Sequence, residues 1–286
     1  MEIKDYVKKY DPQNQFNVLV NTYQQIEFAW KNNFSIDKIN KSDISNIIIS
    51  GLGGSAISAD LIKNYLGNEI AIPIIVNRNY NLPKFASKNT LFIASSYSGN
   101  TEETISSLKQ AIEIGCKIVC ITTGGEVESI AKSKKLNCVK VQPGLQPRYS
   151  LGLSFFSLLK VFQELNLIPD QTKIVENVID LWKQKGIEYS NEGNFAYTFA
   201  ESLVGFIPVI YSVADSTSAV GYRFKCQLNE NSKLHAFHNE IPEMNHNEII
   251  GWESYHEKVY DLKISNIDDE IYHSHIKKQY EKLIER

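Results

Sequence analysis

The chain has 286 residues, which at roughly 150 residues per domain suggests about two domains, each with a core of its own. Its 30 Lys and Arg residues against 33 Asp and Glu residues give a formal net charge of −3, and this near-balance argues against a nucleic-acid-binding surface. Apolar residues make up 43% of the sequence and charged residues 22%, which excludes wholesale disorder. We therefore expect an ordinary globular protein that binds no nucleic acid.

The sequence shows no sign of a membrane segment or of an oxidising compartment. Its first residues, MEIKDYVKKYDPQ, are charged and lack an apolar core, so no signal peptide is expected. No run of about 18 apolar residues occurs, so no membrane-spanning helix is expected either. The four cysteines do not have the spacing of a metal site: Cys116, Cys120, Cys138 and Cys226. We expect a cytoplasmic protein with no membrane partner.

The first half of the chain has the pattern of an α/β domain. Residues 1 to about 43 are polar, with aromatic and aliphatic residues at helical spacing, which predicts one or two amphipathic helices. Short β-branched runs then predict strands at 46–51, 73–78, 90–96, 117–123 and 138–141. Helical patterns lie between them at 55–67, 101–115 and 126–134. Because the strands are apolar on both faces, we expect a parallel sheet with helices on both faces, in a domain that ends near residue 150.

The second half of the chain begins with predicted helices and then again shows a predicted strand followed by a predicted helix. Two helical patterns follow each other over 151–165 and 171–186, which predicts a helical connector. A strand at 206–212 and a helix over 214–233 then resemble the first strand and helix of the chain, so an internal duplication is expected. The predicted division is an N-terminal domain, a connector and a second α/β domain: 1–150, 151–190 and 191–286.

Two turns follow predicted parallel strands, at the end of the sheet where open α/β folds bind ligands. They are GLGGS (51–55) and SSYSGNT (95–101), and each leads into a predicted helix. Backbone N–H groups at a helix start, with hydroxyls nearby and glycines that allow close approach, can bind an anion. No Lys follows either glycine cluster, so we expect a small phosphomonoester rather than a metal-bound nucleoside triphosphate. A simple turn with a helix cap is the alternative for each turn taken alone.

A dinucleotide-binding turn is a further alternative. The pattern that begins at Gly51 and Gly53 has Ala56 where a third glycine would fall. No acidic residue closes the next predicted strand, where Asn77 and Arg78 stand. Both departures favour a phosphosugar over a nicotinamide cofactor.

Five segments carry a resemblance to a known family. GLGGSAISADL and SSYSGNTEET resemble the two phosphate loops of SIS (sugar isomerase) domains. PGLQPRYSLG (143–152), QLNENSK (227–233) and IPEMNHNEIIGW (241–252) resemble motifs of the bifunctional phosphoglucose/phosphomannose isomerase family. The resemblance runs from about residue 40 to 262. It implies two SIS-type, flavodoxin-like α/β subdomains joined by helices, in a homodimer with a shared active site.

The resemblance also implies a reaction and the residues that carry it. The reaction interconverts glucose 6-phosphate or mannose 6-phosphate with fructose 6-phosphate through a cis-enediolate, without a metal or other cofactor. Glu230 matches the family's proton-transferring base, and Arg148 matches the arginine that stabilises the enediolate. His246 matches the histidine that assists ring opening in the neighbouring subunit's site. We assign phosphate binding to Gly54, Ser55, Ser96, Ser98 and Thr101.

The remaining histidines are expected to be solvated or structural: His235, His238, His256, His273 and His275. A zinc site is the alternative, drawn from His235, His238, His246, Glu240 and Glu243. This set has no paired-ligand spacing on a predicted helix, and the resemblance implies no metal.

The sequence differs from the family's pattern near the C-terminus. Family members continue after this point to a C-terminal helix with an active-site lysine, whereas 34 residues follow Trp252 here. We assign that role to none of Lys277, Lys278 and Lys282, and we expect an incomplete second domain. Three hypotheses stay open: the isomerase, a non-catalytic protein that binds sugar phosphates, and another SIS chemistry such as aminosugar-phosphate isomerisation.

Overall fold

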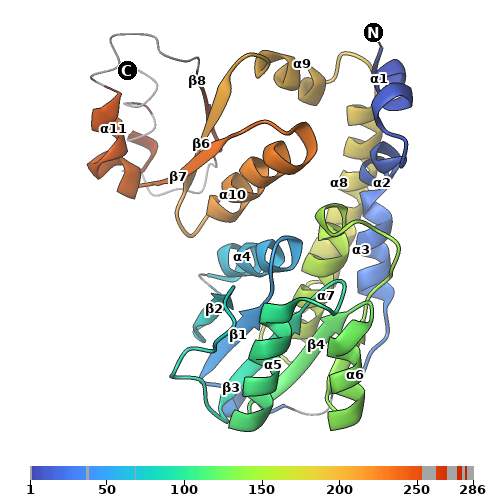
Figure 1. Cartoon of the computed structure of the whole chain (residues 1–286), viewed down its shortest axis with the longest axis vertical. Helices are drawn as coiled ribbons and strands as arrows, with labels where there is room; N and C mark the ends of the chain where they lie inside the picture. Colours follow the sequence, from blue (N-terminus) through green and yellow to red (C-terminus); the bar gives the residue numbers. More distant parts are fainter. Residues whose placement is uncertain are drawn as a thin grey trace. The chain divides into compact units, whose positions relative to one another are not determined.

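The computed structural model describes residues 2–36, 39–67, 69–252, 262–268, 276–278 and 281. The chain forms two compact units, Met1–Phe195 and Ala196–Arg286, and each is described by itself (Figure 1). Among the helices that the structure describes, none has the length and apolarity needed to cross a membrane. The predicted boundaries at residues 150 and 190 stay a prediction.

The first unit is built on a five-stranded parallel sheet in the order β2-β1-β3-β4-β5 (Figure 1). Its strands are β1 Asn46–Ser50, β2 Ile74–Asn77, β3 Thr90–Ser95, β4 Lys117–Thr122 and β5 Asn137–Lys140. Both ends of every strand lie within one residue of the predicted range. This strand order is that of flavodoxin-like folds, and it confirms the predicted α/β class.

Helices cover both faces of this sheet. One face carries α3 Thr22–Lys31, α4 Gly54–Leu66 and α7 Leu151–Glu164, and the other carries α5 Glu102–Ile114 and α6 Gly125–Lys134 (Figure 1). Successive side chains of a strand point to opposite faces, so Ile47 and Ile49 lie in one core and Ile48 in the other. All three are fully buried, and each contributes about 1.5–3 kcal/mol. The two cores explain why the strands are apolar throughout.

The N-terminal region holds three short helices where the pattern predicts one or two. They are α1 Ile3–Tyr10, α2 Gln15–Val20 and α3, followed by the 3₁₀ turn η1 Lys41–Asp43. The break falls at Asp11, whose carboxylate accepts the backbone N–H groups of Gln15 at 2.8 Å and Phe16 at 2.7 Å and so begins α2. The long helix α8, Thr172–Ser190, packs on α2 and α3, so the helices of the predicted connector belong to the first unit.

The second unit contains three described strands, all parallel, in the order β7-β6-β8. They are β6 Ile207–Val213, β7 Phe237–Ile241 and β8 Leu262–Asn266, with α9 Phe195–Ser202 before β6 and α10 Ser218–Gln227 packed on β6 and β7. The helix predicted over 214–233 is shorter, because residues 214–217 form a turn in which the Thr217 hydroxyl accepts the Val213 N–H at 3.0 Å. After α10 the chain continues as a π-helical turn, η3 Leu228–Ser232.

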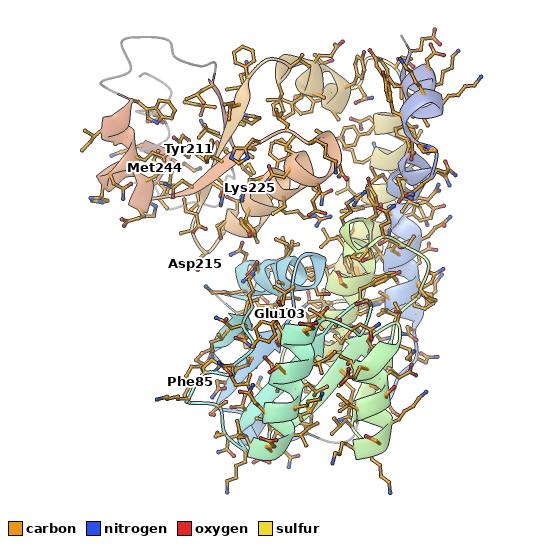
Figure 2. The ribbon with its side chains drawn as sticks, in the orientation of Figure 1. Phe85, Glu103, Tyr211, Asp215, Lys225 and Met244 are labelled. Carbon is orange, nitrogen blue, oxygen red and sulfur yellow. The ribbon has the colours of Figure 1, made fainter. Side chains whose placement is uncertain are left out.

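The sequence pattern does not predict β7. Only Ile241 of this strand is fully buried, and the polar residues before it hide the alternation that marks a strand. Two short helices follow, η4 Glu243–His246 and α11 Glu248–Gly251. Tyr211 of β6 and Met244 of η4 lie together in a core on their side of the sheet (Figure 2).

Candidate active site

The two predicted phosphate turns lie side by side at the carboxyl end of the first unit's sheet. They follow β1 and β3, which pair in parallel with Ser50 opposite Ala94. The chain leaves β1 toward β2 and β3 toward β4, in opposite directions, which is the arrangement that opens a ligand crevice in such sheets. The two turns are in contact, since a side-chain carbon on Gly51 would lie 2.7 Å from the Ser95 carbonyl oxygen. Both turns therefore follow strands as the sequence predicts.

The first turn leads into α4 through glycines. Gly53 is the N-cap residue with a φ of +53°, and it has no side chain with which to cap the helix. Gly54 and the buried Ser55 begin α4, so backbone N–H groups of the first helical turn and one hydroxyl converge there. Such a helix start can bind an anion.

The second turn is an ordered loop of hydroxyl and amide groups. The hydroxyls of Ser96 and Thr101 lie 2.9 Å apart, and the Gly99 N–H donates to Ser96 Oγ at 3.1 Å. The Asn100 N–H donates to Ser98 Oγ at 3.2 Å. Ser96 is buried, whereas Ser98 is exposed. The structure thus gathers the three hydroxyls that the sequence assigns to phosphate binding at the start of α5.

Gly99 allows the next loop of the sheet to pack directly on the second turn. Its φ is +72°, and a side-chain carbon on it would lie only 1.8 Å from the Gly124 carbonyl oxygen. The Val127 N–H donates to the Gly99 carbonyl at 3.0 Å, and the Glu126 N–H donates to Asn100 Oδ1 at 3.1 Å. The shape of the turn therefore depends on glycine at this position.

Charged residues near this edge of the sheet are mostly paired within the fold. Arg78, directly after β2, forms an ion pair with Asp60 of α4. Burial raises the pKa of Asp60, although the Arg78 charge opposes the shift. The Tyr80 hydroxyl donates to the carboxylate of Glu102, the first residue of α5, at 3.3 Å. The charge of Glu103, which is labelled in Figure 2, raises the pKa of Tyr80. The carboxylates of Glu102 and Glu103 also interact favourably with the partial positive charge at the N-terminus of α5.

Arg148 lies in a short 3₁₀ turn, η2 Pro147–Tyr149, just before α7. This turn packs against the first phosphate turn, because a side-chain carbon on Gly54 would lie 2.9 Å from the Pro147 carbonyl oxygen. The Arg148 guanidinium lies 5.2 Å from the centre of the Tyr149 ring. A residue larger than glycine at position 54 would push η2 away from α4.

Tyr97 joins the second phosphate turn to the same segment. Its hydroxyl accepts the Leu145 N–H at 3.0 Å and donates to the Gln142 carbonyl at 3.0 Å. Burial raises the pKa of Tyr97, so the hydroxyl keeps its proton. The structure therefore brings Arg148 and all five predicted phosphate-binding residues to one end of one sheet. Sequence reasoning missed Tyr97, although it stands inside the SSYSGNT motif.

Glu230 lies in the second unit, on the exposed face of η3. The Lys233 ammonium donates to its carbonyl oxygen at 2.6 Å, and the Asn231 amide donates to Gln227 Oε1 at 2.7 Å. Burial lowers the pKa of Arg223, and the charge of Glu230 opposes that shift. The Glu230 carboxylate therefore lies in a polar turn within electrostatic reach of a guanidinium group.

His246 is the exposed last residue of η4. Its neighbours in the NHNE motif fix the turn. Asn247 Oδ1 accepts the Glu248 N–H at 2.6 Å, and Asn247 Nδ2 donates to the Glu243 carboxylate at 3.1 Å. The motif thus holds the histidine at a defined point between η4 and α11.

Glu248 anchors this turn to the sheet. Its carboxylate accepts the Tyr211 hydroxyl at 2.6 Å and the side-chain amide of Asn239, and the Trp252 indole N–H donates to the Tyr211 hydroxyl at 3.0 Å. Tyr211 is fully buried, and its pKa is raised by burial and by the Glu248 carboxylate. Sequence reasoning missed this network. Its only signal is that Glu248 and Trp252 both stand in the segment that contains His246.

Of the other two described histidines, one is largely buried in the fold and one is exposed. The His238 ring lies 2.7 Å from the Ser212 hydroxyl, and burial lowers the pKa of His238 to about 4. His235 is exposed and meets the Phe237 ring edge-on. Among the described residues, no three His, Cys, Asp or Glu side chains gather where they could hold a metal ion. Four residues considered from the sequence lie outside the described part: His256, His273, His275 and Lys282.

Comparison with known protein families identifies the class of the molecule. The SIS domain model matches residues 39–143, which hold the whole five-stranded sheet and both phosphate turns. The model described as the bacterial phospho-glucose isomerase C-terminal SIS domain matches residues 192–285. The chain is therefore a protein of two SIS domains.

Curated relatives narrow the class to a family. The chain is 40% identical over 245 residues to a bifunctional phosphoglucose/phosphomannose isomerase of Caldicellulosiruptor bescii, a match that covers 84% of this chain and 72% of that one. It is 37% identical over 238 residues to the Aquifex aeolicus protein of the same name, with 80% and 69% covered. It is also 31% identical over 232 residues to a D-glucosamine-6-phosphate 4-epimerase of Sulfolobus acidocaldarius, with 80% and 71% covered. The chain belongs to the bifunctional phosphoglucose/phosphomannose isomerase family.

Solved structures confirm the fold. The C-terminal domain of glucosamine-fructose-6-phosphate aminotransferase from Francisella tularensis matches with a TM-score of 0.69 at 14% identity, over 96% of this chain and 81% of that one. Tagatose-6-phosphate ketose/aldose isomerase from Escherichia coli matches with a TM-score of 0.65 at 15% identity, over 94% and 74%. At these identities the likeness concerns the fold alone.

Proposed function

We propose that this protein interconverts fructose 6-phosphate with glucose 6-phosphate and mannose 6-phosphate. Family membership supports the proposal, and one observation carries it. The turn that bears Arg148 packs on the first phosphate turn, and Leu145, two residues before that turn, is hydrogen-bonded to Tyr97 of the second phosphate turn. A sugar phosphate held by the two turns would present its carbon atoms near a fixed cation. A reaction in which negative charge develops on a sugar oxygen requires such a cation.

The phosphate group is bound at the starts of α4 and α5 in this proposal. Backbone N–H groups of the first helical turns and the hydroxyls at these two positions supply the donors, from Gly54, Ser55, Ser96, Ser98 and Thr101. The site needs no metal, because the donors are amides, hydroxyls and the positive ends of two helix dipoles. No cofactor enters the reaction.

The chemistry is a proton transfer between neighbouring carbons. After His246 assists ring opening, the Glu230 carboxylate removes a proton from C1 of fructose 6-phosphate. The electrons of that C–H bond form a C1–C2 double bond, and the C2 carbonyl oxygen takes up the negative charge. Arg148 stabilises this oxygen in the resulting cis-enediolate. The proton of the O1 hydroxyl then passes to O2, a C1–O1 double bond forms, and the electrons of the C1–C2 double bond take up the proton of Glu230 at C2. The face of C2 that receives the proton decides between glucose and mannose.

An assay of the purified protein tests the proposal. Fructose 6-phosphate is supplied, and glucose 6-phosphate and mannose 6-phosphate are followed separately. We expect both aldoses to form and Glu230→Gln to form neither while it still binds fructose 6-phosphate. No turnover by the wild-type protein, with sugar-phosphate binding retained, would contradict the proposal and favour a non-catalytic binding protein.

We further propose that the protein is a cytoplasmic homodimer, in which His246 serves the neighbouring subunit's site. Mixing two inactive variants tests this. A heterodimer of Glu230→Gln and His246→Ala subunits would contain one intact site if His246 acts across the interface, so random mixing restores about a quarter of the wild-type activity. If both residues act within one subunit, every site stays damaged and nothing is restored.

A second candidate function follows from the Sulfolobus acidocaldarius relative, which is named for epimerisation at C4 of glucosamine 6-phosphate. The phosphate turns would serve either substrate. Incubation with glucosamine 6-phosphate, followed by separation of the C4 epimers, distinguishes the two functions. Epimer formation faster than turnover of fructose 6-phosphate would favour the second.

A further inference from the structure

The turn that carries Arg148 contacts α3, a helix that precedes the segment matched by the SIS domain model. Gln25 of this helix is 5% exposed and reaches across to the turn. Its side-chain Nε2 donates to the Tyr149 carbonyl at 2.8 Å, and its Oε1 accepts the Leu153 N–H at 3.3 Å. Tyr149 follows Arg148 directly, and Leu153 lies in the first turn of α7. The Gln25 side-chain amide is thus hydrogen-bonded to the backbone of the last residue of η2 and to the backbone of the first turn of α7.

The two helices meet closely at this amide. A side-chain carbon on Gly152 would lie 3.0 Å from the Gln25 Cβ atom, so α3 and α7 are in backbone-to-side-chain contact there. At the other end of α3, the buried Lys160 ammonium of α7 donates to the Trp30 carbonyl at 2.6 Å and the Asn32 carbonyl at 2.8 Å. Helix α3 therefore contacts α7 near both of its ends, and these contacts fix the position of the Gln25 backbone.

From this geometry we propose that Gln25 is a positioning residue that fixes the direction of Arg148 without touching the substrate. The inference rests on the proposed function, in which Arg148 stabilises the enediolate. Loss of the Gln25 amide leaves the Tyr149 carbonyl and the Leu153 N–H to find other partners, and the turn shifts. A displacement of about 1 Å at a group that acts on the transition state can cost about 100-fold in rate.

Binding of two ligands tests the role without relying on turnover. A five-carbon aldonohydroxamate 5-phosphate mimics the planar, charged enediolate, whereas sorbitol 6-phosphate carries the same phosphate without the charge at the reacting end. By calorimetry, Gln25→Met is expected to weaken hydroxamate binding by about 10- to 100-fold and sorbitol 6-phosphate binding by less than about 3-fold. Gln24→Met, the same substitution at the exposed neighbouring position on α3, is the matched control and should change neither.

A double-mutant cycle separates positioning from general damage to the fold. In an Arg148→Ala background, Gln25→Met should weaken hydroxamate binding by less than about 2-fold, because the group that it positions is gone. An equal loss in both backgrounds, or a wild-type affinity in Gln25→Met, would overturn the inference. If Gln25→Met does not fold, Gln25→Glu keeps the acceptor for Leu153, loses the donor to Tyr149 and should give the same result. If the double-mutant cycle shows coupling between Gln25 and Arg148 but the wild-type protein does not turn over fructose 6-phosphate, the proposed function is contradicted and the positioning role of Gln25 is not.

Discussion

The Tyr97 hydroxyl accepts the backbone N–H of Leu145 at 3.0 Å and so joins the second phosphate turn to the segment that carries Arg148. The same hydroxyl donates to the Gln142 carbonyl, and burial keeps it protonated by raising the pKa of Tyr97. In the proposed reaction these two elements act on opposite ends of a six-carbon sugar phosphate. A single oxygen atom therefore helps to set the distance between phosphate binding and charge stabilisation.

Tyr97→Phe removes this oxygen and keeps the ring. We expect kcat/KM for fructose 6-phosphate to fall by about 10-fold, because the segment with Arg148 is freed at one end. The free energy of unfolding should fall by about 1 kcal/mol for each of the two lost hydrogen bonds. Steady-state kinetics and urea unfolding measure the two effects. Tyr10→Phe, at an exposed tyrosine of α1, is the control and should keep wild-type kinetics. Wild-type kinetics in Tyr97→Phe as well would show that the Tyr97 hydroxyl has no such role.

Gly99→Ala should abolish phosphate binding. The new side-chain carbon would have to occupy space 1.8 Å from the Gly124 carbonyl oxygen, so the second turn must rearrange. Gly115→Ala is a matched control, because Gly115 also has a positive φ, of +80°, but faces open space. Both variants should lose about 1–2 kcal/mol of stability from backbone strain, and Gly99→Ala should lose more because of the contact with Gly124. Only Gly99→Ala should lose binding of inorganic phosphate in a calorimetric titration. Phosphate binding by Gly99→Ala at wild-type affinity would remove this turn from the site.

Glu248→Gln tests the support beneath His246. The variant keeps the size of the side chain, but the Tyr211 hydroxyl and the Asn239 amide donate to different carboxylate oxygens, and one of these becomes an NH2 group that cannot accept. We expect a loss of about 1–3 kcal/mol in the free energy of unfolding and a fall in kcat of about 10-fold. Glu201→Gln, at an exposed position on α9, should change neither quantity. A stable, fully active Glu248→Gln protein would show that the network does not hold His246 in place.

His238 should make the stability of the protein dependent on pH. Its folded-state pKa of about 4 lies below the ordinary value of 6.5, so the unfolded chain binds a proton at a higher pH than the folded chain does. The stabilising contribution is therefore complete above pH 6.5 and is lost as the pH falls toward 4. Urea unfolding across this range should show a steeper decline for the wild-type protein than for His238→Gln. His235→Gln, at an exposed histidine, should follow the wild type, and equal slopes in all three proteins would contradict the assignment.

Much of the first unit could be predicted from the sequence. Isoleucine-rich strands such as Ile47–Ile49 mark a sheet buried on both faces, and the glycines of the turns mark the points where backbone must approach closely. Gly54 shows what a local pattern can and cannot predict. The sequence identifies it as part of a phosphate turn. Its contact with the Pro147 carbonyl, however, joins residues far apart in the chain, and no local pattern predicts it.

The supports of the candidate site were harder to predict for the same reason. Gln25 resembles any polar residue of an amphipathic helix, and only the tertiary structure shows that its amide bonds the backbone beside Arg148. Strand β7 escapes prediction because His238, Asn239 and Glu240 make its pattern polar. Asn239 nevertheless has a partner in Glu248, which explains why a polar residue is stable in that strand.

The central claim is that this protein moves a proton between C1 and C2 of a sugar 6-phosphate, and one measurement tests it most directly. Fructose 6-phosphate is incubated with the protein in deuterium oxide, and the products are followed by nuclear magnetic resonance. We predict deuterium at C2 of newly formed glucose 6-phosphate and mannose 6-phosphate with the wild-type protein, because the proton held by Glu230 exchanges with the solvent in part of the turnovers before it is returned to the sugar. Glu230→Gln should give none, although it binds fructose 6-phosphate. Unchanged fructose 6-phosphate after incubation with the wild type, or equal labelling by Glu230→Gln, would contradict the account.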